Sequence, residues 1–197
     1  MAKVLTKESF DKLVNLELEA DSPEYISRAI FLLSFNLIGI SFVDLITLKR
    51  TDVLDGRIVY RRKKTKRIYS IKLNHIAQGI ITQLESLNPK SPYLIPLLQN
   101  ECSTALNEKL TVQLRLKTCN KYLKKIGTQL NFDLVLTTYV ARYTWATTAK
   151  RCGFSNEIIA EALGHEYGNA VTSTYLDGFS HEIIDNANDT ITRMMFG

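Results

Sequence analysis

The sequence of 197 residues contains only three cysteines, Cys102, Cys119 and Cys152, and their spacing matches no metal-binding motif. We therefore expect no zinc site, and the odd number of cysteines favours unpaired thiols in a reducing cytoplasm. No apolar run approaches the ~18–20 residues of a membrane span, because Ser34 and Asn36 interrupt the longest candidate. The N-terminus also lacks the apolar region of a signal peptide. These absences exclude a disulfide-rich secreted protein and a membrane protein.

Negative charge is scarce in two segments, and the net charge of the chain is +5. Only Asp52 and Asp55 oppose a first group of basic residues, Lys49, Arg50, Arg57, Arg61, Arg62, Lys63, Lys64, Lys66, Arg67 and Lys72. No acidic residue interrupts a second group, Arg115, Lys117, Lys121, Lys124 and Lys125, whereas acidic residues predominate after Gly153. A segregated basic face indicates a polyanionic partner such as nucleic acid, although either segment alone could be a solvated face without a function.

Helical patterns predominate along the chain. Apolar periodicity and capping residues predict helices from about Thr6, from Pro23 to about Leu37, from Phe42 to Lys49, and from Asn74 to Leu87. Later patterns predict one or two helices over 103–129 and further helices over 139–151, 155–164 and 170–176. A last amphipathic segment carries Phe179, Ile183, Ile184, Ile191, Met194 and Met195. It packs either against its own chain or on a neighbouring copy.

One basic β-hairpin interrupts the helices. Residues 57–61 are rich in β-branched side chains, residues 63–66 form a polar turn, and residues 67–73 alternate as a second strand. No internal repeat or linker is visible. We therefore predict a single domain over residues 1–197 that is mostly α with a small antiparallel β-sheet, an α+β fold.

Three short motifs follow one another in a fixed order, and a tyrosine completes them. The hairpin turn carries Lys64-Thr65, a helix carries Tyr139-Val-Ala-Arg142, and Leu163-Gly164-His165 is followed after ten residues by Tyr175. Each residue taken alone has a simpler interpretation: a surface ion pair for Arg142, a helix cap for His165, and packing for Tyr175. Lys64 alone would be one of several lysines that bind a phosphate backbone.

Taken together, the order and spacing of these motifs resemble the catalytic domain of tyrosine recombinases, the phage integrase family. The runs that begin at Gly39 and at Tyr60 resemble the branch found on mobile elements of Bacteroides-type bacteria. This resemblance implies the tyrosine-recombinase catalytic-domain fold, with no metal and no cofactor. It implies an integrase that breaks and rejoins double-stranded DNA through a 3′-phosphotyrosyl intermediate, with self-association into a tetramer and accessory DNA-bending proteins as further partners. We would expect such a protein in the bacterial cytoplasm, on the nucleoid.

The resemblance also assigns roles to residues. Tyr175 becomes the nucleophile, and Arg142 and His165 become donors to the non-bridging phosphate oxygens, where negative charge develops. Lys64 becomes the general acid for the leaving 5′-oxygen, although Lys63 and Lys66 lie close enough to compete. The remaining basic residues of the hairpin are expected to bind the DNA backbone: Arg61, Arg62, Lys63, Lys66 and Arg67.

Two positions depart from the family pattern. Ser41 stands where the family has its first arginine, and a neutral hydroxyl does not replace a charged donor. Arg28, on the preceding apolar helix, is the candidate substitute, although it is as readily an ordinary exposed arginine. Tyr139 stands where the family usually has histidine or lysine. These departures keep open a second hypothesis, a DNA-binding module of the same fold that is weakly active or inactive.

The family signature begins almost at the N-terminus, near Thr6. Because members of the family typically carry an N-terminal core-binding domain, we expect this chain to be an excised or truncated catalytic domain with weak, salt-dependent DNA binding. A strand-nicking topoisomerase with the same nucleophile is a third hypothesis.

Overall fold

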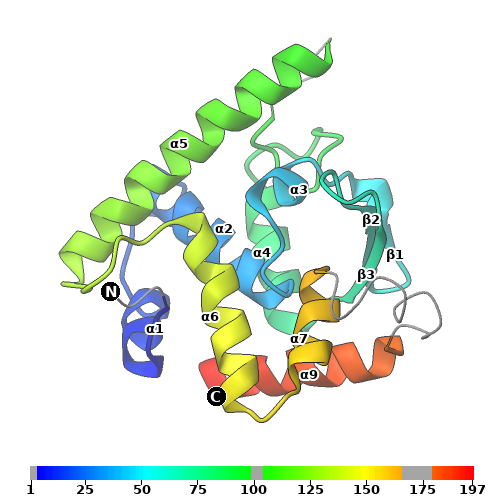
Figure 1. Ribbon diagram of the computed structural model, residues 1–197. Helices are drawn as coiled ribbons and strands as arrows, with labels where there is room; N and C mark the ends of the chain where they lie inside the picture. The colour runs from blue at the N-terminus through cyan, green and yellow to red at the C-terminus, as the bar shows by residue number, and fades with distance from the viewer. Residues whose placement is uncertain (1–3, 99–103, 166–178) are drawn as a thin grey trace.

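The structure, a computed structural model, describes residues 4–98, 104–165 and 179–197. It is mostly helical with one small antiparallel sheet, which confirms the predicted fold class (Figure 1). The helices are α1 (Lys7–Val14), α2 (Pro23–Asn36), α3 (Phe42–Ile46), α4 (His75–Glu85), α5 (Ala105–Gln129), α6 (Thr138–Arg151), α7 (Asn156–Leu163) and α9 (His181–Phe196), with a 3-10 turn at Arg50–Asp52. The helix expected over 170–176 lies outside the described residues.

Side-chain caps explain where several helices begin. The hydroxyls of Ser22, Ser41 and Ser155 accept hydrogen bonds from backbone N–H groups in the first turns of α2, α3 and α7. Pro23 follows the cap of α2, where its missing N–H costs nothing. At the other end of α7, Gly164 adopts the left-handed conformation and terminates the helix. The sequence therefore encodes these boundaries locally.

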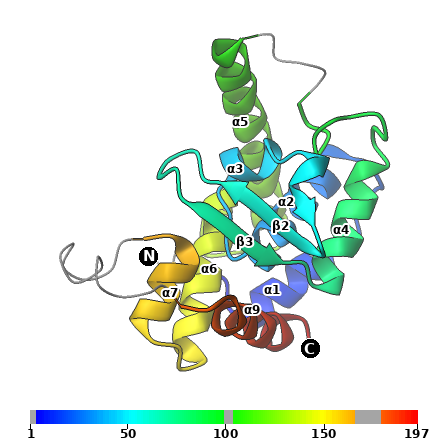
Figure 2. The ribbon, with the colours of Figure 1, turned by 90° about the vertical axis from the view of Figure 1, so that its right-hand side faces the viewer.

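The sheet has the order β1-β2-β3, with β1 at Val53–Leu54, β2 at Arg57–Arg61 and β3 at Ile68–Lys72. The predicted hairpin is β2 and β3, which pair antiparallel with Tyr60 opposite Tyr69. The sequence analysis missed β1, because a strand of two residues is too short to show alternation. Figure 2 shows the sheet lying on one side of the helical body.

Helix α2 forms the centre of the molecule and packs against α4, α5 and α6. Most of its side chains are buried, and two of its buried polar side chains, Ser34 and Asn36, donate to backbone carbonyls. Ser34 donates to the carbonyl of Ile40 and the Asn36 amide donates to the carbonyl of Leu32, both at 2.8 Å. The turn that follows α2 is thereby held in the core, and it leads into the site described below.

The C-terminal helix α9 packs against its own chain, beside α1, α6, α7 and β3 (Figures 1 and 2). The indole N–H of Trp145 donates to the side chain of Asn188 at 2.8 Å, and both groups are buried. The Arg57 guanidinium makes a two-pronged ion pair with Asp185, with distances of 2.6 and 3.0 Å. The structure thus adopts the first of the two arrangements expected for this segment.

Within the described residues, no helix is long and apolar enough to cross a membrane. Cys119 and Cys152 are both free thiols. Helix α5 is a single helix rather than two, and its N-terminal end projects beyond the body of the molecule (Figure 1).

Candidate active site and DNA-binding surface

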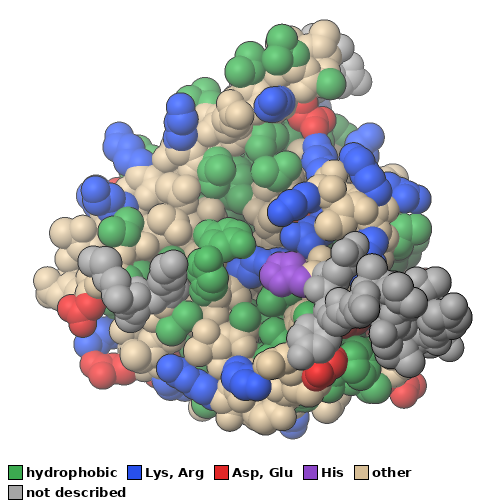
Figure 3. Space-filling model, viewed as in Figure 1, with side chains coloured by type: hydrophobic (Ala, Val, Ile, Leu, Met, Phe, Trp, Pro, Cys, Tyr) green, Lys and Arg blue, Asp and Glu red, His purple; other side chains and the backbone are tan. Residues whose placement is uncertain are grey.

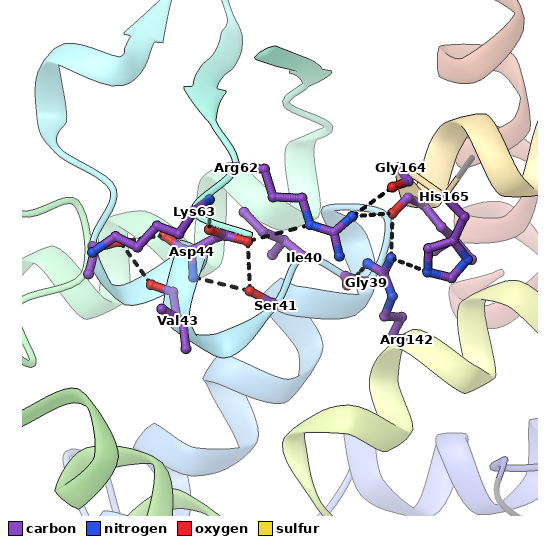
Figure 4. A network of polar contacts seen from close by, with 12 residues as sticks. Gly39, Ile40, Ser41, Val43, Asp44, Arg62, Lys63, Arg142, Gly164 and His165 are labelled. Carbon is purple, nitrogen blue, oxygen red and sulfur yellow. Dashed lines mark hydrogen bonds and ion pairs between the residues drawn. The ribbon is translucent and has the colours of Figure 1, made fainter. Parts of the chain in front are cut away.

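Arg142 lies at the centre of the candidate site. Its side chain projects from α6 and is only 7% exposed. One guanidinium nitrogen, Nη1, donates to the carbonyl of Gly39 at 2.8 Å, and Nη2 donates to the carbonyl of Leu163. Nη2 also lies 3.3 Å from Nε2 of His165. The structure therefore brings together two residues that the sequence analysis assigned to one site (Figure 4).

Gly39 makes this close packing possible. It has a φ of +62°, and a Cβ atom at this position would lie 2.6 Å from the Cα of Arg142. Glycine alone fits both the positive φ and the contact with a backbone atom. The turn between α2 and α3 consequently approaches α6 closely enough for the carbonyl of Gly39 to hold the guanidinium.

The C-terminal end of α7 provides the other carbonyls of the site. Carbonyls at a helix C-terminus lack helical partners and carry partial negative charge, so they attract cations. Gly164 ends the helix, and a Cβ there would lie 1.9 Å from the Tyr69 hydroxyl. His165, the next residue, is exposed. The Leu163-Gly164-His165 motif thus presents two carbonyls and an imidazole on the same side.

Arg62 meets the same carbonyls from the hairpin. Its Nη1 donates to the carbonyls of Leu163 and Gly164 at 3.1 and 2.9 Å. The sequence analysis assigned Arg62 to the DNA backbone together with its basic neighbours. The structure places it next to Arg142, with the Leu163 carbonyl shared between the two guanidinium groups (Figure 4).

Asp44 joins Arg62 to the position of the missing arginine. Ser41 caps α3, and its hydroxyl donates to Oδ2 of Asp44 at 2.7 Å. The other carboxylate oxygen accepts the backbone N–H of Lys63 at 2.9 Å, and Oδ2 lies 3.9 Å from Nε of Arg62. Asp44 was missed by the sequence analysis, although its spacing of three residues after a capping serine was a visible signal.

The cluster carries excess positive charge. Burial, followed by the nearby Arg62 guanidinium, lowers the pKa of Arg142. Burial also lowers the pKa of His165, and the charges of Arg142, Arg62 and Lys64 lower it further. Among the described residues, Asp44 is the only carboxylate paired with Arg142, Arg62 or His165. An anion bound here would offset this mutual repulsion.

The predicted general acid Lys64 lies in the exposed hairpin turn, close enough for its charge to affect His165. Arg61, Lys63, Lys66 and Arg67 of the hairpin are also exposed, but several of them have acidic or backbone partners. Lys63 pairs with Glu108 of α5, Arg67 pairs with Glu161 of α7, and Arg61 donates to the carbonyl of Lys66. Figure 3 shows Lys and Arg side chains gathered on this face, over the hairpin and along α5. The predicted basic surface and the candidate site therefore lie on the same face.

The remaining predicted site residues are placed as follows. Tyr139 is 52% exposed, packs edge-on against Tyr143, and borders a shallow hollow together with Ser41 and Arg142. Arg28 donates to the carbonyls of Val14 and Leu16, and no hydrogen bond or ion pair joins it to the cluster in the described part of the chain. Tyr175 lies outside the described residues.

The Tyr69 hydroxyl was not anticipated as part of the site. It is buried against Gly164 and has no hydrogen-bond partner among the described residues. No group of three or more His, Cys, Asp or Glu side chains that could hold a metal occurs in the same part of the chain. The chemistry available here is therefore that of guanidinium, imidazole, ammonium and hydroxyl groups.

Comparisons with known proteins bear on what this arrangement does. The model of the phage integrase family matches residues 3–181. A solved structure described as the crystal structure of XerA recombinase resembles the whole chain with a TM-score of 0.58 at 20% identity. That match covers 100% of this chain and 63% of the XerA chain, and at this identity it shows a shared fold. A search of curated protein sequences found no match.

Proposed function

Because the chain belongs to the phage integrase family, we propose that it is a site-specific DNA recombinase that acts through a covalent bond between Tyr175 and a DNA phosphate. The observation that carries this proposal is the contact between Arg142 and His165 at the end of α7, ten residues before Tyr175. A buried guanidinium next to an imidazole, on a basic face, suits a phosphodiester better than a neutral substrate.

The proposed chemistry is a transesterification. The Tyr175 oxygen forms a bond to phosphorus while the bond between phosphorus and the 5′-oxygen breaks. The phenol proton passes to solvent, and the Lys64 ammonium protonates the leaving 5′-oxygen. Since one phosphodiester replaces another, the reverse attack by a 5′-hydroxyl rejoins the strand without an energy source.

Arg142 and His165 stabilise the charge that develops on the non-bridging oxygens. Because the pKa of His165 is lowered, its imidazole is mainly neutral at pH 7. If Nε2 accepts a hydrogen bond from Arg142, the proton of the neutral ring is on Nδ1, and this N–H is then free to donate to a phosphate oxygen. Preorganised donors of this kind are typically worth ~3 kcal/mol each in the transition state.

The basic hairpin and α5 supply the expected contacts to double-stranded DNA. We further propose that copies of the protein assemble on DNA and that the reaction serves a mobile element, in line with the resemblance of the Gly39 and Tyr60 runs. The chain spans 63% of the XerA chain it matches, so these properties of a whole recombinase are proposals for this one.

The experiment uses a pool of nicked duplexes with randomised sequence, because the target sequence is unknown. A nick just downstream of the cleaved phosphate lets the short fragment that carries the free 5′-hydroxyl diffuse away, and this traps the covalent product. DNA that remains protein-linked after denaturation, and is released by protease, should be recovered with the wild-type chain. No protein-linked DNA should be recovered with the Tyr175→Phe variant.

The alternative function is a DNA-binding module without catalysis, and Ser41 and Tyr139 are the observations that favour it. Such a protein would retain duplex binding with the salt dependence of phosphate contacts. It would yield no protein-linked DNA from the same pool, and wild type and Tyr175→Phe would then behave alike.

A further inference from the structure

The geometry points to Arg62 as a second guanidinium ligand of the DNA phosphate, supplied by the hairpin and held in place by Asp44. This inference rests on the proposed function, which it deepens by completing the charged groups around the phosphate. It also gives Ser41 a role, since Ser41 orients the carboxylate that holds Arg62. Arg28 is not needed as the substitute.

Arg62 lies beside Arg142 at the end of α7. Its Nη1 and the Nη2 of Arg142 both donate to the carbonyl of Leu163, so the two guanidinium groups lie on either side of one oxygen atom. Like charges at this distance repel each other, and the Arg62 side chain is only 12% exposed. Three neutral carbonyls and one carboxylate, which lies 3.9 Å from Arg62, leave the pair with a net positive charge. A phosphate between them would neutralise this excess.

Arg62 also keeps hydrogen-bond donors available for a ligand. Among the described residues, Arg62 uses Nη1 for carbonyls and has no hydrogen-bond partner for Nη2. A guanidinium has five N–H donors, and unused donors in a poorly solvated position favour an anionic ligand. The buried Tyr69 hydroxyl, which also lacks a partner among these residues, lies next to Arg62 at Gly164.

Asp44 fixes the hairpin in place. Its side chain is only 4% exposed, and its carboxylate accepts the backbone N–H of Lys63 and faces Arg62. A turn attached in this way has little freedom, so Arg62 is preorganised before DNA binds. Asp44 is therefore a positioning residue, whereas Arg62 contacts the substrate.

Arg193 is the charge-matched control. It is an exposed arginine on α9, outside the basic hairpin, and its guanidinium donates to the hydroxyl of Thr190. Removal of Arg62 also takes one positive charge from the basic face and should weaken DNA binding slightly, so both variants are compared at a protein concentration that saturates the DNA. Only the removal of Arg62 should also remove a donor from the reacting phosphate.

The first test measures the rate of covalent adduct formation on DNA recovered from the randomised pool. Arg62→Gln should be slower than wild type by roughly 100-fold or more, the usual effect of losing one charged transition-state donor. Arg193→Gln should react at the wild-type rate, since this residue lies outside both the candidate site and the basic hairpin. Equal rates for the two variants would overturn the assignment.

A methylphosphonate at the cleaved position separates a chemical role from a structural one. The methyl group removes the negative charge that Arg62 is inferred to neutralise, so the defect of Arg62→Gln relative to wild type should shrink on this substrate. A defect of unchanged size would mean that Arg62 acts only by holding the fold together.

The role of Asp44 is tested by a double-mutant cycle. Asp44→Asn should slow adduct formation in the wild-type background and have little further effect in the Arg62→Gln background. Equal effects in both backgrounds would refute the positioning role while leaving the assignment of Arg62 intact.

The last test does not depend on cleavage. The pKa of His165, followed by NMR and assigned with a His165→Asn variant, should rise in Arg62→Gln because a neighbouring positive charge is removed. Inorganic phosphate should raise the pKa of His165 in the wild type more than in Arg62→Gln, whereas Arg193→Gln should match the wild type. If wild type forms no adduct with any DNA, the proposed function fails, and this titration still decides whether Arg62 belongs to the anion site.

Discussion

Replacement of Gly39 by alanine should destabilise the protein and disturb Arg142 at the same time. The new Cβ would lie 2.6 Å from the Cα of Arg142 and 2.9 Å from its Cβ, so the turn between α2 and α3 must move. A left-handed conformation costs an L-residue ~1–2 kcal/mol, and overpacking of this kind costs a further ~1–3 kcal/mol. We expect the free energy of unfolding to fall by ~2–5 kcal/mol, a decrease in Tm of roughly 4–20 °C for a domain of this size.

Gly56→Ala provides the control for this prediction. Gly56 has a φ of +73°, but nothing lies within 4 Å of a Cβ at that position. This variant therefore pays for the left-handed conformation without the clash, and the difference between the two variants isolates the contact with α6. Urea unfolding followed by tryptophan fluorescence measures both, because Trp145 lies in α6. A Gly39→Ala variant no less stable than Gly56→Ala would refute the close approach of the turn to Arg142.

Three further predictions concern the site and its support. Arg142→Ala should abolish covalent DNA adducts, whereas Tyr139→Phe should only reduce them; equal losses in a gel assay for protein-linked DNA would show that Tyr139 is indispensable. Because the pKa of His165 lies below its ordinary value, the imidazole stays neutral at pH 7 and becomes charged only on further acidification. Protonation of Nε2 would remove the acceptor that holds the Arg142 guanidinium and place two positive charges side by side. The rate of adduct formation should therefore decline as pH falls below about 6.5, and a His165→Asn variant with the same pH profile as wild type would exclude this cause. Arg57→Ala should loosen α9 and speed its removal by limited proteolysis, because it breaks a partly buried two-pronged ion pair with Asp185. Lys72→Ala breaks a more exposed ion pair with Asp189 and should have little effect. Similar rates of digestion for the two variants would contradict this prediction.

Much of the fold could be predicted from the sequence, because its signals are local. Ser22 followed by Pro23 predicts the start of α2, and Gly164 predicts the end of α7 without any knowledge of the rest of the chain. The alternation in residues 67–73 predicts β3 in the same way. The two-residue strand β1 was missed because it is defined by its partner rather than by its own pattern.

The candidate site was predictable only in part. The motif order pointed to Arg142 and His165, and the structure brings these two side chains together. The sequence did not distinguish Arg62 from its basic neighbours, because only tertiary packing decides which side chain of the turn meets the end of α7. Arg28 was a reasonable substitute on position alone, but its guanidinium caps carbonyls at Val14 and Leu16.

The most direct test of the central proposal is to identify the amino acid that becomes linked to DNA. Protein-linked DNA from the randomised pool would be digested with protease and nuclease, and the modified peptide sequenced by mass spectrometry. The proposed function predicts a nucleotide attached through its 3′-phosphate to Tyr175, and none in Arg142→Ala. An adduct on another residue, or on a 5′-phosphate, would contradict it.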